Sequence, residues 1–188
     1  MTKITELLKA RQKILTIQDL GVIWRENDRK KLIEAIKYYL RKGDLKKIKK
    51  GIYYIEKDFD DFELAQKIVP VSYISFYTAL NKHGVVFQYY KNIHSMALKT
   101  KNVKVEDKIF KYHQIKSDIF FNSLGIEQKE NYLIASKERA ICDSLYLKPK
   151  LAFDNLSGLD VEKLLKIAGI YENQNLLKEI KKLIKDYA

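Results

Sequence analysis

Residues 45–55 contain two short β-prone runs on either side of the dipeptide Lys50-Gly51. Glycine adopts the positive φ angle that a tight turn between strands requires, so this pattern predicts a β-hairpin. Lysines recur along the first run and at the turn, which gives the expected hairpin a basic edge. The fold that contains such a hairpin then depends on what precedes it.

The segment before the hairpin has helical patterning. Apolar spacing predicts a short helix over 2–10 and a second short helix that begins after Thr16, whose hydroxyl can accept a hydrogen bond from an orphan amide. Asn27 is the predicted cap of a longer helix over 28–41, and Gly43 is placed to end that helix. Three helices followed by a lysine-rich hairpin is the element order of a winged helix-turn-helix.

The net charge of the chain is concentrated in the same region. The whole sequence has a formal charge of +12, and residues 1–57 hold 16 Lys and Arg against 7 Asp and Glu, which leaves +9 there and +3 in residues 58–188. A basic region favours a polyanionic partner, either nucleic acid or an anionic membrane surface. Charge and element order together predict that residues 1–57 form a winged helix-turn-helix that binds double-stranded DNA.

Basic residues occupy the side of the third predicted helix opposite its apolar residues, and they cluster at its N-terminal end. Arg29 and Asn27 are the best candidates for reading bases, because Arg can bond guanine and Asn can bond adenine through two hydrogen bonds. Lysines of the helix and the hairpin are expected to contact phosphates. The candidate DNA-binding residues are Arg25, Asn27, Arg29, Lys30, Lys31, Lys37, Lys46, Lys47, Lys49 and Lys50.

Two less specific interpretations stay open for these residues. In a lysine-rich protein, the basic side of a helix can simply face solvent without binding a partner. The hairpin lysines are also typical of edge strands, where they block pairing with another chain. Phosphate contact and edge protection need the same residue type in the same place, so both can hold.

The remaining sequence predicts a connecting segment and a second domain. Residues 58–70 contain a short amphipathic helix over 61–68, and the second domain covers 71–188. This domain is expected to begin with a helix over 72–84 and to continue through short antiparallel strands between 85 and 132. Three more helices are expected at 136–147, 161–168 and about 173–187. The fold class predicted for the chain is α+β.

Few residues have the spacing of a catalytic or metal site. His83, His94 and His113 lie far apart, with no Cys pair or carboxylate at ligand spacing, so no metal site is expected. Cys142 lies on a predicted helix beside apolar residues, which indicates a buried thiol rather than a nucleophile. No nucleotide-binding or acyl-transfer motif is present. We therefore expect a protein that is not an enzyme and uses no cofactor.

The sequence also bears on the cellular compartment. No apolar run approaches transmembrane length, and the N-terminal residues lack the apolar region of a signal peptide. A single cysteine cannot form an internal disulfide, which agrees with a reducing compartment. We expect a cytoplasmic protein without a membrane partner.

Three segments of the chain resemble the AbiEi antitoxin family of bacterial abortive-infection systems. They are KKGIYYI (49–55), ELAQKIVPVSYISFYTALNKHG (63–84) and ASKERAICDSLYL (135–147), and the match spans residues 10–150 approximately. The resemblance implies an N-terminal DNA-binding domain that represses its own operon, with inverted repeats in the promoter as its target. It also implies a C-terminal domain that counteracts a partner toxin, usually a nucleotidyltransferase-like protein encoded beside it. Among the matched residues, Arg139 is a candidate toxin contact, with an internal ion pair as the alternative.

Two other functions compete with an antitoxin and autorepressor. The first is a plain transcription regulator whose second domain binds a ligand or forms a dimer. The second is a nuclease that uses acidic residues of the β-rich region, but the sequence shows no cluster of carboxylates of the kind that metal-dependent cleavage needs. The nuclease is the weakest of the three hypotheses.

Overall fold

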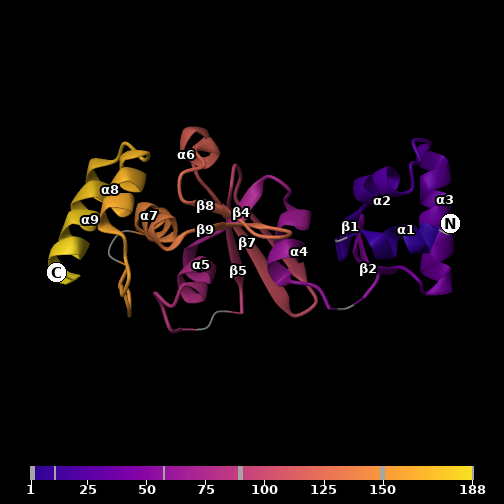
Figure 1. The fold of residues 1–188 in the computed structure, drawn as a ribbon, viewed down its shortest axis with the longest axis horizontal. Helices are drawn as coiled ribbons and strands as arrows, with labels where there is room; N and C mark the ends of the chain where they lie inside the picture. Colours follow the sequence, from indigo (N-terminus) through magenta and orange to yellow (C-terminus); the bar gives the residue numbers. More distant parts are fainter. Residues whose placement is uncertain (1–2, 11, 57, 89–90, 149–150, 188) are drawn as a thin grey trace. The chain divides into compact units, whose positions relative to one another are not determined.

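The structure, a computed structural model, describes residues 3–10, 12–56, 58–88, 91–148 and 151–187. The chain divides into two compact units, residues 1–70 and 71–188, and each combines helices with a sheet (Figure 1). Among the described residues, no helix is both long enough and apolar enough to cross a membrane. The fold class is α+β, with one antiparallel sheet and one mixed sheet.

The first unit combines helices with a small sheet. Its elements are α1 (Lys3–Lys9), β1 (Ile14–Thr16), α2 (Ile17–Ile23), α3 (Arg29–Lys42), β2 (Lys46–Lys49), β3 (Ile52–Tyr54) and α4 (Asp61–Ile68). The sheet has the order β1-β3-β2, and both neighbouring pairs are antiparallel. The predicted hairpin is confirmed, since β2 and β3 are joined by a turn at Lys50-Gly51 in which Gly51 has a φ angle of 84°.

Strand β1 is an element that the sequence does not predict. It has only three residues, and both Ile14 and Leu15 are buried, so it lacks the apolar and polar alternation of a half-buried strand. Its pairing with β3 places Ile14 opposite Tyr54 and Thr16 opposite Ile52. Because β3 lies well over thirty positions later along the chain, local patterning does not identify it as the partner of β1.

The core of the first unit is built from apolar side chains of its first three helices and its sheet. The buried members are Leu7, Leu15, Leu20, Trp24, Leu32, Ile36, Leu45 and Tyr53. The indole nitrogen of Trp24 donates a hydrogen bond to the carbonyl oxygen of Lys3 at 3.0 Å, which ties α2 to the start of α1. Fully burying such side chains contributes about 1.5–3 kcal/mol each, so this cluster fixes how the three helices pack.

Caps define where the helices of the first unit begin. Thr16 caps α2 as predicted, and its hydroxyl accepts a hydrogen bond from the amide of Asp19 while the Asp19 carboxylate accepts one from the amide of Thr16. The predicted cap of α3 is wrong by one residue. Asp28, not Asn27, caps this helix, because a carboxylate both accepts amide hydrogen bonds and interacts favourably with the helix dipole. Gly43 ends α3 in the left-handed conformation, as predicted.

Helix α4 has the predicted bounds and belongs to the first unit. The buried carboxylate of Glu63 accepts a hydrogen bond from the amide of Ile14 at 3.2 Å. Lys67 forms an ion pair with Asp19 at 2.8 Å. Although burial acts to raise it, the pKa of Asp19 is lowered by the hydrogen bonds from Lys67 and Thr16. The segment predicted as a connector, residues 58–70, therefore packs on β1 and α2.

The second unit is built around a larger sheet. Its elements are β4 (Ser72–Ile74), α5 (Phe76–Lys82), β5 (Ile93–Ala97), β6 (Lys101–Val105), β7 (Lys108–Gln114), α6 (Ser117–Phe121), β8 (Ile126–Gln128), β9 (Leu133–Ala135), α7 (Lys137–Leu147), α8 (Val161–Gly169) and α9 (Gln174–Tyr187). The strand order is β6-β7-β5-β4-β9-β8. Helices α7, α8 and α9 lie where the sequence predicts helices, with Ser136 as the cap of α7.

The first predicted helix of this unit, 72–84, is wrong at its start. Residues 72–74 form the central strand β4, and the helix begins only at Phe76. All three strand residues are buried, so their apolar run merges with the helical pattern that follows. Phe76 has a φ angle of 55°, which marks the sharp change from strand to helix.

The expected strands also need correction. Residues 85–88 form no strand, and the apolar run at 118–122 lies mostly in α6. The pairs β6–β7 and β8–β9 are antiparallel as predicted. The pair β4–β5 is also antiparallel, although β4 was predicted as helix, and β4–β9 and β5–β7 are parallel. The hairpins β6–β7 and β8–β9 follow from short turns, but parallel neighbours are joined by crossovers whose partners local patterning does not specify.

Candidate nucleic-acid interface

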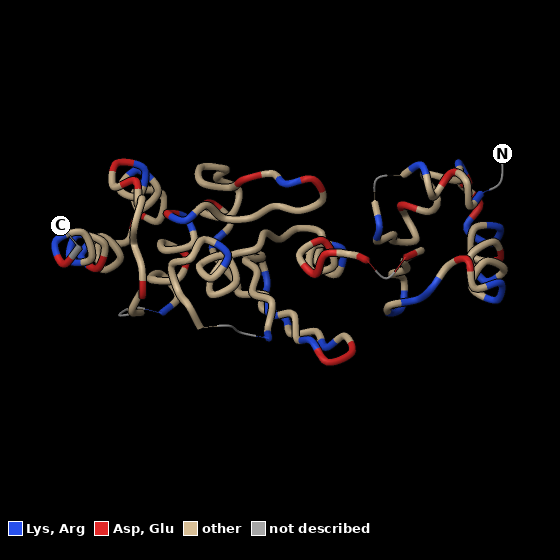
Figure 2. Tube along the Cα trace, turned by 60° about the horizontal axis from the view of Figure 1, so that its bottom comes forward, with Lys and Arg blue, Asp and Glu red and all other residues tan. Residues whose placement is uncertain are grey.

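The predicted DNA-binding residues gather on α3, the turn before it and the hairpin after it. Figure 2 shows basic positions along α3 and along the segment that follows it. Nine of the ten predicted side chains are exposed and Lys49 is half-buried. The sequence prediction that the outer side of α3 is basic is therefore confirmed as far as exposure is concerned.

These basic side chains differ from other lysines of the first unit in their pairing. None of the nine basic residues among the ten forms an ion pair with a residue in the described part of the chain. By contrast, Lys13 pairs with Asp58 at 2.7 Å and Lys42 pairs with Asp44 at 3.3 Å. A lysine or arginine without an ionic partner in the protein is free to neutralise a phosphate. Neutralising a phosphate releases its counterions, which favours binding to a polyanion.

The N-terminal end of α3 has an acidic residue as well as basic ones. The Asp28 carboxylate accepts hydrogen bonds from the amides of Lys30 at 2.8 Å and Lys31 at 3.3 Å. These amides, which could otherwise hold a phosphate, are thus occupied from within the chain. Contacts to DNA from this end of the helix must come from side chains, and Arg29, Lys30 and Lys31 are all exposed there.

The turn between α2 and α3 is tight. A Cβ atom on Gly21 would lie 3.3 Å from the Leu32 side chain and 3.4 Å from the carbonyl oxygen of Glu26, so the small residue allows the two helices to approach. Arg25 has a φ angle of 50°, a left-handed conformation that costs a non-glycine residue about 1–2 kcal/mol. This conformation places an exposed arginine at the corner before α3.

The hairpin presents its lysines from an edge strand. Among the described strands, β2 pairs only with β3, and the register shifts between Lys47 and Lys49, which indicates a bulge. The Lys46 ammonium lies 6.0 Å from the centre of the Tyr54 ring. An edge position fits both alternatives kept open above, phosphate contact and protection against strand pairing.

The two structural units differ less in net charge than residues 1–57 and 58–188 do. Residues 58–70 hold four acidic residues, Asp58, Asp60, Asp61 and Glu63, against one lysine, Lys67. The unit 1–70 therefore holds 17 basic against 11 acidic residues, a net +6, and the unit 71–188 holds 19 against 13, also +6. The predicted asymmetry between +9 and +3 thus depends on ending the domain at residue 57. What distinguishes the first unit is the concentration of exposed base on α3 and β2, not its total charge.

Arg139 is placed differently from the prediction of a toxin contact. Its side chain is fully buried. The guanidinium donates hydrogen bonds to the carbonyl oxygens of Ile119 (2.7 Å), Asn122 (3.2 Å) and Leu124 (3.0 Å), and to the Tyr73 hydroxyl (3.2 Å). It therefore holds the end of α6 and the following turn against α7, and it offers no surface to a partner. The internal ion pair, the alternative for this residue, is what the structure shows.

Asp143 is the ionic partner of Arg139. Its carboxylate lies 3.5 Å from the Arg139 Nε, and neither side chain is exposed. The same carboxylate accepts hydrogen bonds from the hydroxyls of Tyr73, Ser75 and Tyr171. Burial raises the pKa of Asp143, while Arg139 and the three hydroxyls favour the charged form. This network connects α7 with β4 and with the turn before α9.

A second polar pair joins a buried histidine, His94, to a half-buried one, His113, and the sequence does not predict it. His94 on β5 and His113 on β7 share a hydrogen bond of 2.8 Å between Nδ1 and Nε2. Burial, together with His113 and Lys111, lowers the pKa of His94 to about 3, and burial also lowers the pKa of His113. The two residues are 19 positions apart, and only the parallel pairing of their strands brings them together.

The structure provides little for catalysis or for a metal. Burial raises the pKa of the Cys142 thiol, so this group is protonated and enclosed at neutral pH. Within the described ranges, no three His, Cys, Asp or Glu side chains come close enough to hold a metal ion.

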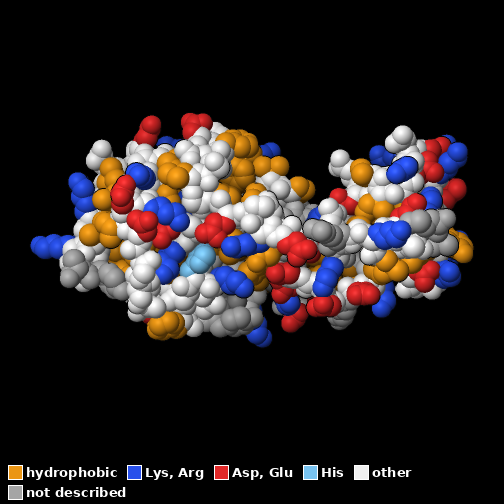
Figure 3. All heavy atoms as spheres, viewed as in Figure 1, with side chains coloured by type: hydrophobic (Ala, Val, Ile, Leu, Met, Phe, Trp, Pro, Cys, Tyr) orange, Lys and Arg blue, Asp and Glu red, His pale blue; other side chains and the backbone are white. Residues whose placement is uncertain are grey.

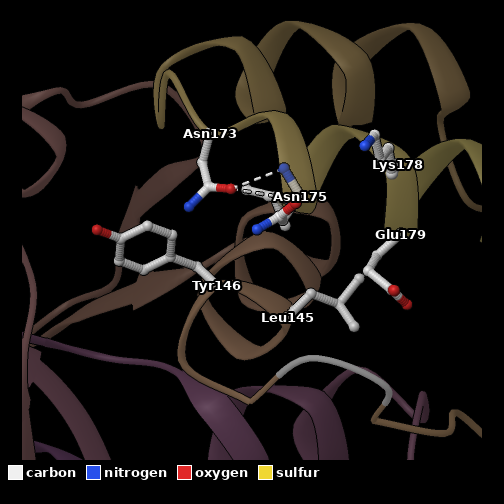
Figure 4. Close-up of a pocket in the computed structure, with 7 residues that line it drawn as sticks. Leu145, Tyr146, Asn173, Asn175, Lys178 and Glu179 are labelled. Carbon is white, nitrogen blue, oxygen red and sulfur yellow. Dashed lines mark hydrogen bonds between the residues drawn. The ribbon is translucent and has the colours of Figure 1, made fainter.

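One hollow lies beside α3 and another between α7 and α9. The first, of about 410 Å³, is lined by Glu34, Lys37, Leu40 and Arg41. The second, of about 260 Å³, is lined by residues that include Tyr146, Asn173 and Asn175 (Figure 4). Figure 4 shows the Asn173 side chain turned toward the start of α9, where it accepts hydrogen bonds from the amides of Asn175 and Leu176. Its carboxamide oxygen is thus engaged in capping a helix.

Comparisons with known proteins provide no family assignment. A scan against models of protein families finds no match to this chain. A search of curated proteins finds no match either.

Proposed function

We propose that the protein is a DNA-binding transcription regulator whose residues 1–57 act as a winged helix-turn-helix. The succession of three helices, with the tight turn between α2 and α3, and then the hairpin β2–β3 supports this fold. The observation that carries the proposal is the exposure of basic and polar residues on α3, its preceding turn and the hairpin, without ion pairs in the described chain. In this proposal the protein is not an enzyme and needs no cofactor.

Each part of this surface has a role in the proposal. Helix α3 enters the major groove, where Arg29 and Asn27 read base edges. Lys30, Lys31 and Lys37 contact phosphates, and the hairpin lysines lie along the DNA backbone and position the protein without reading sequence. Arg25 supports the contact at the corner before α3.

The more specific role that we propose is that of an antitoxin and autorepressor. This part of the proposal is supported by the resemblance to the AbiEi family, with a nucleotidyltransferase-like protein as the toxin and inverted repeats in the promoter as the DNA target. Because Arg139 is buried, counteraction of the toxin does not use it as a contact. Residues 71–188 act in this role through other surfaces or without contact with the toxin.

A mobility-shift assay tests the DNA-binding part. We expect the full chain to shift a duplex from the region upstream of its own gene at lower concentration than a scrambled duplex of the same length. Failure to shift any duplex at low salt would show that the proposal is wrong.

A growth assay tests the antitoxin part. The full chain is co-expressed with the nucleotidyltransferase-like protein encoded beside its gene, and a variant with Arg29→Ala, Lys30→Ala and Lys31→Ala serves as the comparison. We expect both forms to restore growth, since the antitoxin role is assigned to the second unit. If neither restores growth although both accumulate, the protein is a plain regulator.

A further inference from the structure

Helix α9 carries a row of lysines on one side. At 3.6 residues per turn, these residues fall within an arc of about 100° and extend over roughly 10 Å of helix. All are exposed, and basic side chains project from the end of the second unit where α9 lies (Figure 3). The row consists of Lys178, Lys181, Lys182 and Lys185.

These lysines are not neutralised by the acids around them. Glu179 and Asp186 are the acidic residues of α9, and both lie to one side of the row. No member of the row forms an ion pair with a described residue. On the neighbouring helix α8, by contrast, Lys163 pairs with Glu138 at 2.8 Å and Lys166 pairs with Glu162 at 2.7 Å. Positive charge is therefore balanced on α8 and unbalanced on α9.

The opposite side of α9 is already packed. Leu176 and Ile180 are buried, and Leu177, Leu183 and Ile184 are half-buried. A helix that lies in a membrane surface needs its apolar face free to enter the lipid. Among the described side chains of α9, the lysine side is the more exposed one, which favours a hydrated polyanion over a bilayer.

We propose that the lysine row of α9 binds the phosphate backbone of duplex DNA, as a second contact of the regulator proposed above, on which this inference rests. Lysine is a point charge that suits phosphates, whereas base reading favours the planar fork of arginine or an amide. A row of roughly 10 Å matches about three base-pair steps at 3.4 Å each along one strand. The row therefore adds affinity without sequence discrimination.

A lysine-acetylation footprint tests this interaction directly in the full chain. The protein is acetylated with and without a saturating duplex at low salt, and modified lysines are measured by mass spectrometry. We expect DNA to protect the α9 row and the lysines of α3. The control lysines Lys99, Lys101, Lys104 and Lys116, which are exposed elsewhere on the second unit, should stay reactive.

A matched pair of variants tests the energetic effect. Replacing the four α9 lysines with Gln should reduce the slope of log affinity against log salt by about 0.9 for each phosphate that the variant no longer neutralises, while the ratio of promoter to scrambled affinity is unchanged. Replacing the four control lysines with Gln removes the same charge and should leave the slope close to that of the wild type.

Each outcome separates the two proposals. Protection at α3 without protection at α9, or equal slopes for the two variants, would overturn the role of α9 and leave the proposed regulator intact. Absence of protection at every lysine would overturn the regulator as well. Loss of sedimentation with phosphatidylglycerol vesicles in the α9 variant, with DNA affinity unchanged, would assign the row to membranes and also overturn the proposal.

Discussion

The α3–hairpin surface of the first unit and the core of the second unit use charged residues in opposite ways. On α3 and the hairpin of the first unit, basic side chains are exposed and lack ionic partners among the described residues. In the second unit, Arg139 and Asp143 are fully buried and surrounded by hydrogen-bond partners. An arginine can therefore serve as a surface contact or as an internal residue that holds the backbone through hydrogen bonds. The burial of its side chain distinguishes the two roles.

Mutations of buried and of exposed charged residues should have different effects on stability. A buried charge whose partner is removed remains uncompensated inside the protein, which costs about 3–5 kcal/mol. An exposed charge can be removed with a change of about 0.5 kcal/mol or less. Stability and DNA affinity should thus respond to separate sets of residues.

The largest expected effect is on the buried pair. Arg139→Met should lower the free energy of unfolding of the second unit by about 3–5 kcal/mol, because Asp143 is left buried without its cation. Urea unfolding followed by far-UV circular dichroism measures this change. Trp24, the single tryptophan and a residue of the first unit, provides fluorescence as an internal control that should not shift.

A double replacement sharpens the same prediction. Arg139→Met combined with Asp143→Leu should recover part of the lost stability, since neither charge then remains alone in the core. A destabilisation below about 1 kcal/mol for Arg139→Met would show that the buried pair does not hold the second unit together.

The next effect concerns base reading by the exposed set. Arg29→Ala should reduce discrimination between promoter and scrambled duplexes by about 1–3 kcal/mol, because the variant cannot form the bidentate hydrogen bonds to a base. Lys47→Ala should weaken both duplexes about equally, since phosphate contacts carry no sequence information. Competition binding measures both ratios. An unchanged ratio for Arg29→Ala would remove its assignment as a base reader.

The histidine pair gives a pH dependence specific to the second unit. The pKa of His94 is about 3 in the folded protein, against about 6.5 when unfolded, so the unfolded chain binds the proton more readily. Stability should therefore fall as pH drops below about 6.5, and His94 alone accounts for at most about 1.4 kcal/mol of this fall per pH unit. Urea unfolding by circular dichroism between about pH 6.5 and pH 5, above the range of most carboxylates, measures the slope. His94→Gln should flatten it, and an equally steep slope in this variant would contradict the account.

The smallest effect is at the corner before α3. Arg25→Gly relieves the left-handed conformation and should change the stability of the first unit by about 1 kcal/mol or less, in the stabilising direction relative to Arg25→Ala. Trp24 fluorescence during urea unfolding compares the two variants. Both should bind DNA more weakly than the wild type, because both lack the same charge. Lower stability for Arg25→Gly than for Arg25→Ala would show that backbone strain is not stored there.

Local features of the fold were predictable from the sequence. The caps Thr16 and Gly43, the bounds of α4 and the turn at Lys50-Gly51 depend on residues within a few positions of one another. The exposure of the basic side of α3 follows from its helical period in the same way. The cap of α3 was missed by one residue, because Asn27 and Asp28 are both good capping types.

Features that depend on distant partners were not predictable. Strands β1 and β4 have three residues each and are largely or wholly buried, so no alternation identifies them. The burial of Arg139 depends on carbonyl groups 15–20 positions earlier. Its hydrogen bonds and the meeting of His94 with His113 arise from sheet order and helix packing, which a single sequence does not specify.

We propose that exposed basic residues of the first unit, which lack ion pairs in the described chain, bind DNA, and that the buried charges of the second unit hold its fold. The most direct test is the salt dependence of duplex affinity for the variant with Arg29→Ala, Lys30→Ala and Lys31→Ala, measured beside its Trp24 unfolding curve. We predict that affinity falls roughly tenfold or more and that the salt slope becomes shallower, with stability changed by about 0.5 kcal/mol or less per substitution. The variant Lys99→Ala, Lys101→Ala and Lys104→Ala, which removes the same charge, should bind as the wild type does. Wild-type affinity and slope in the α3 variant would contradict the claim.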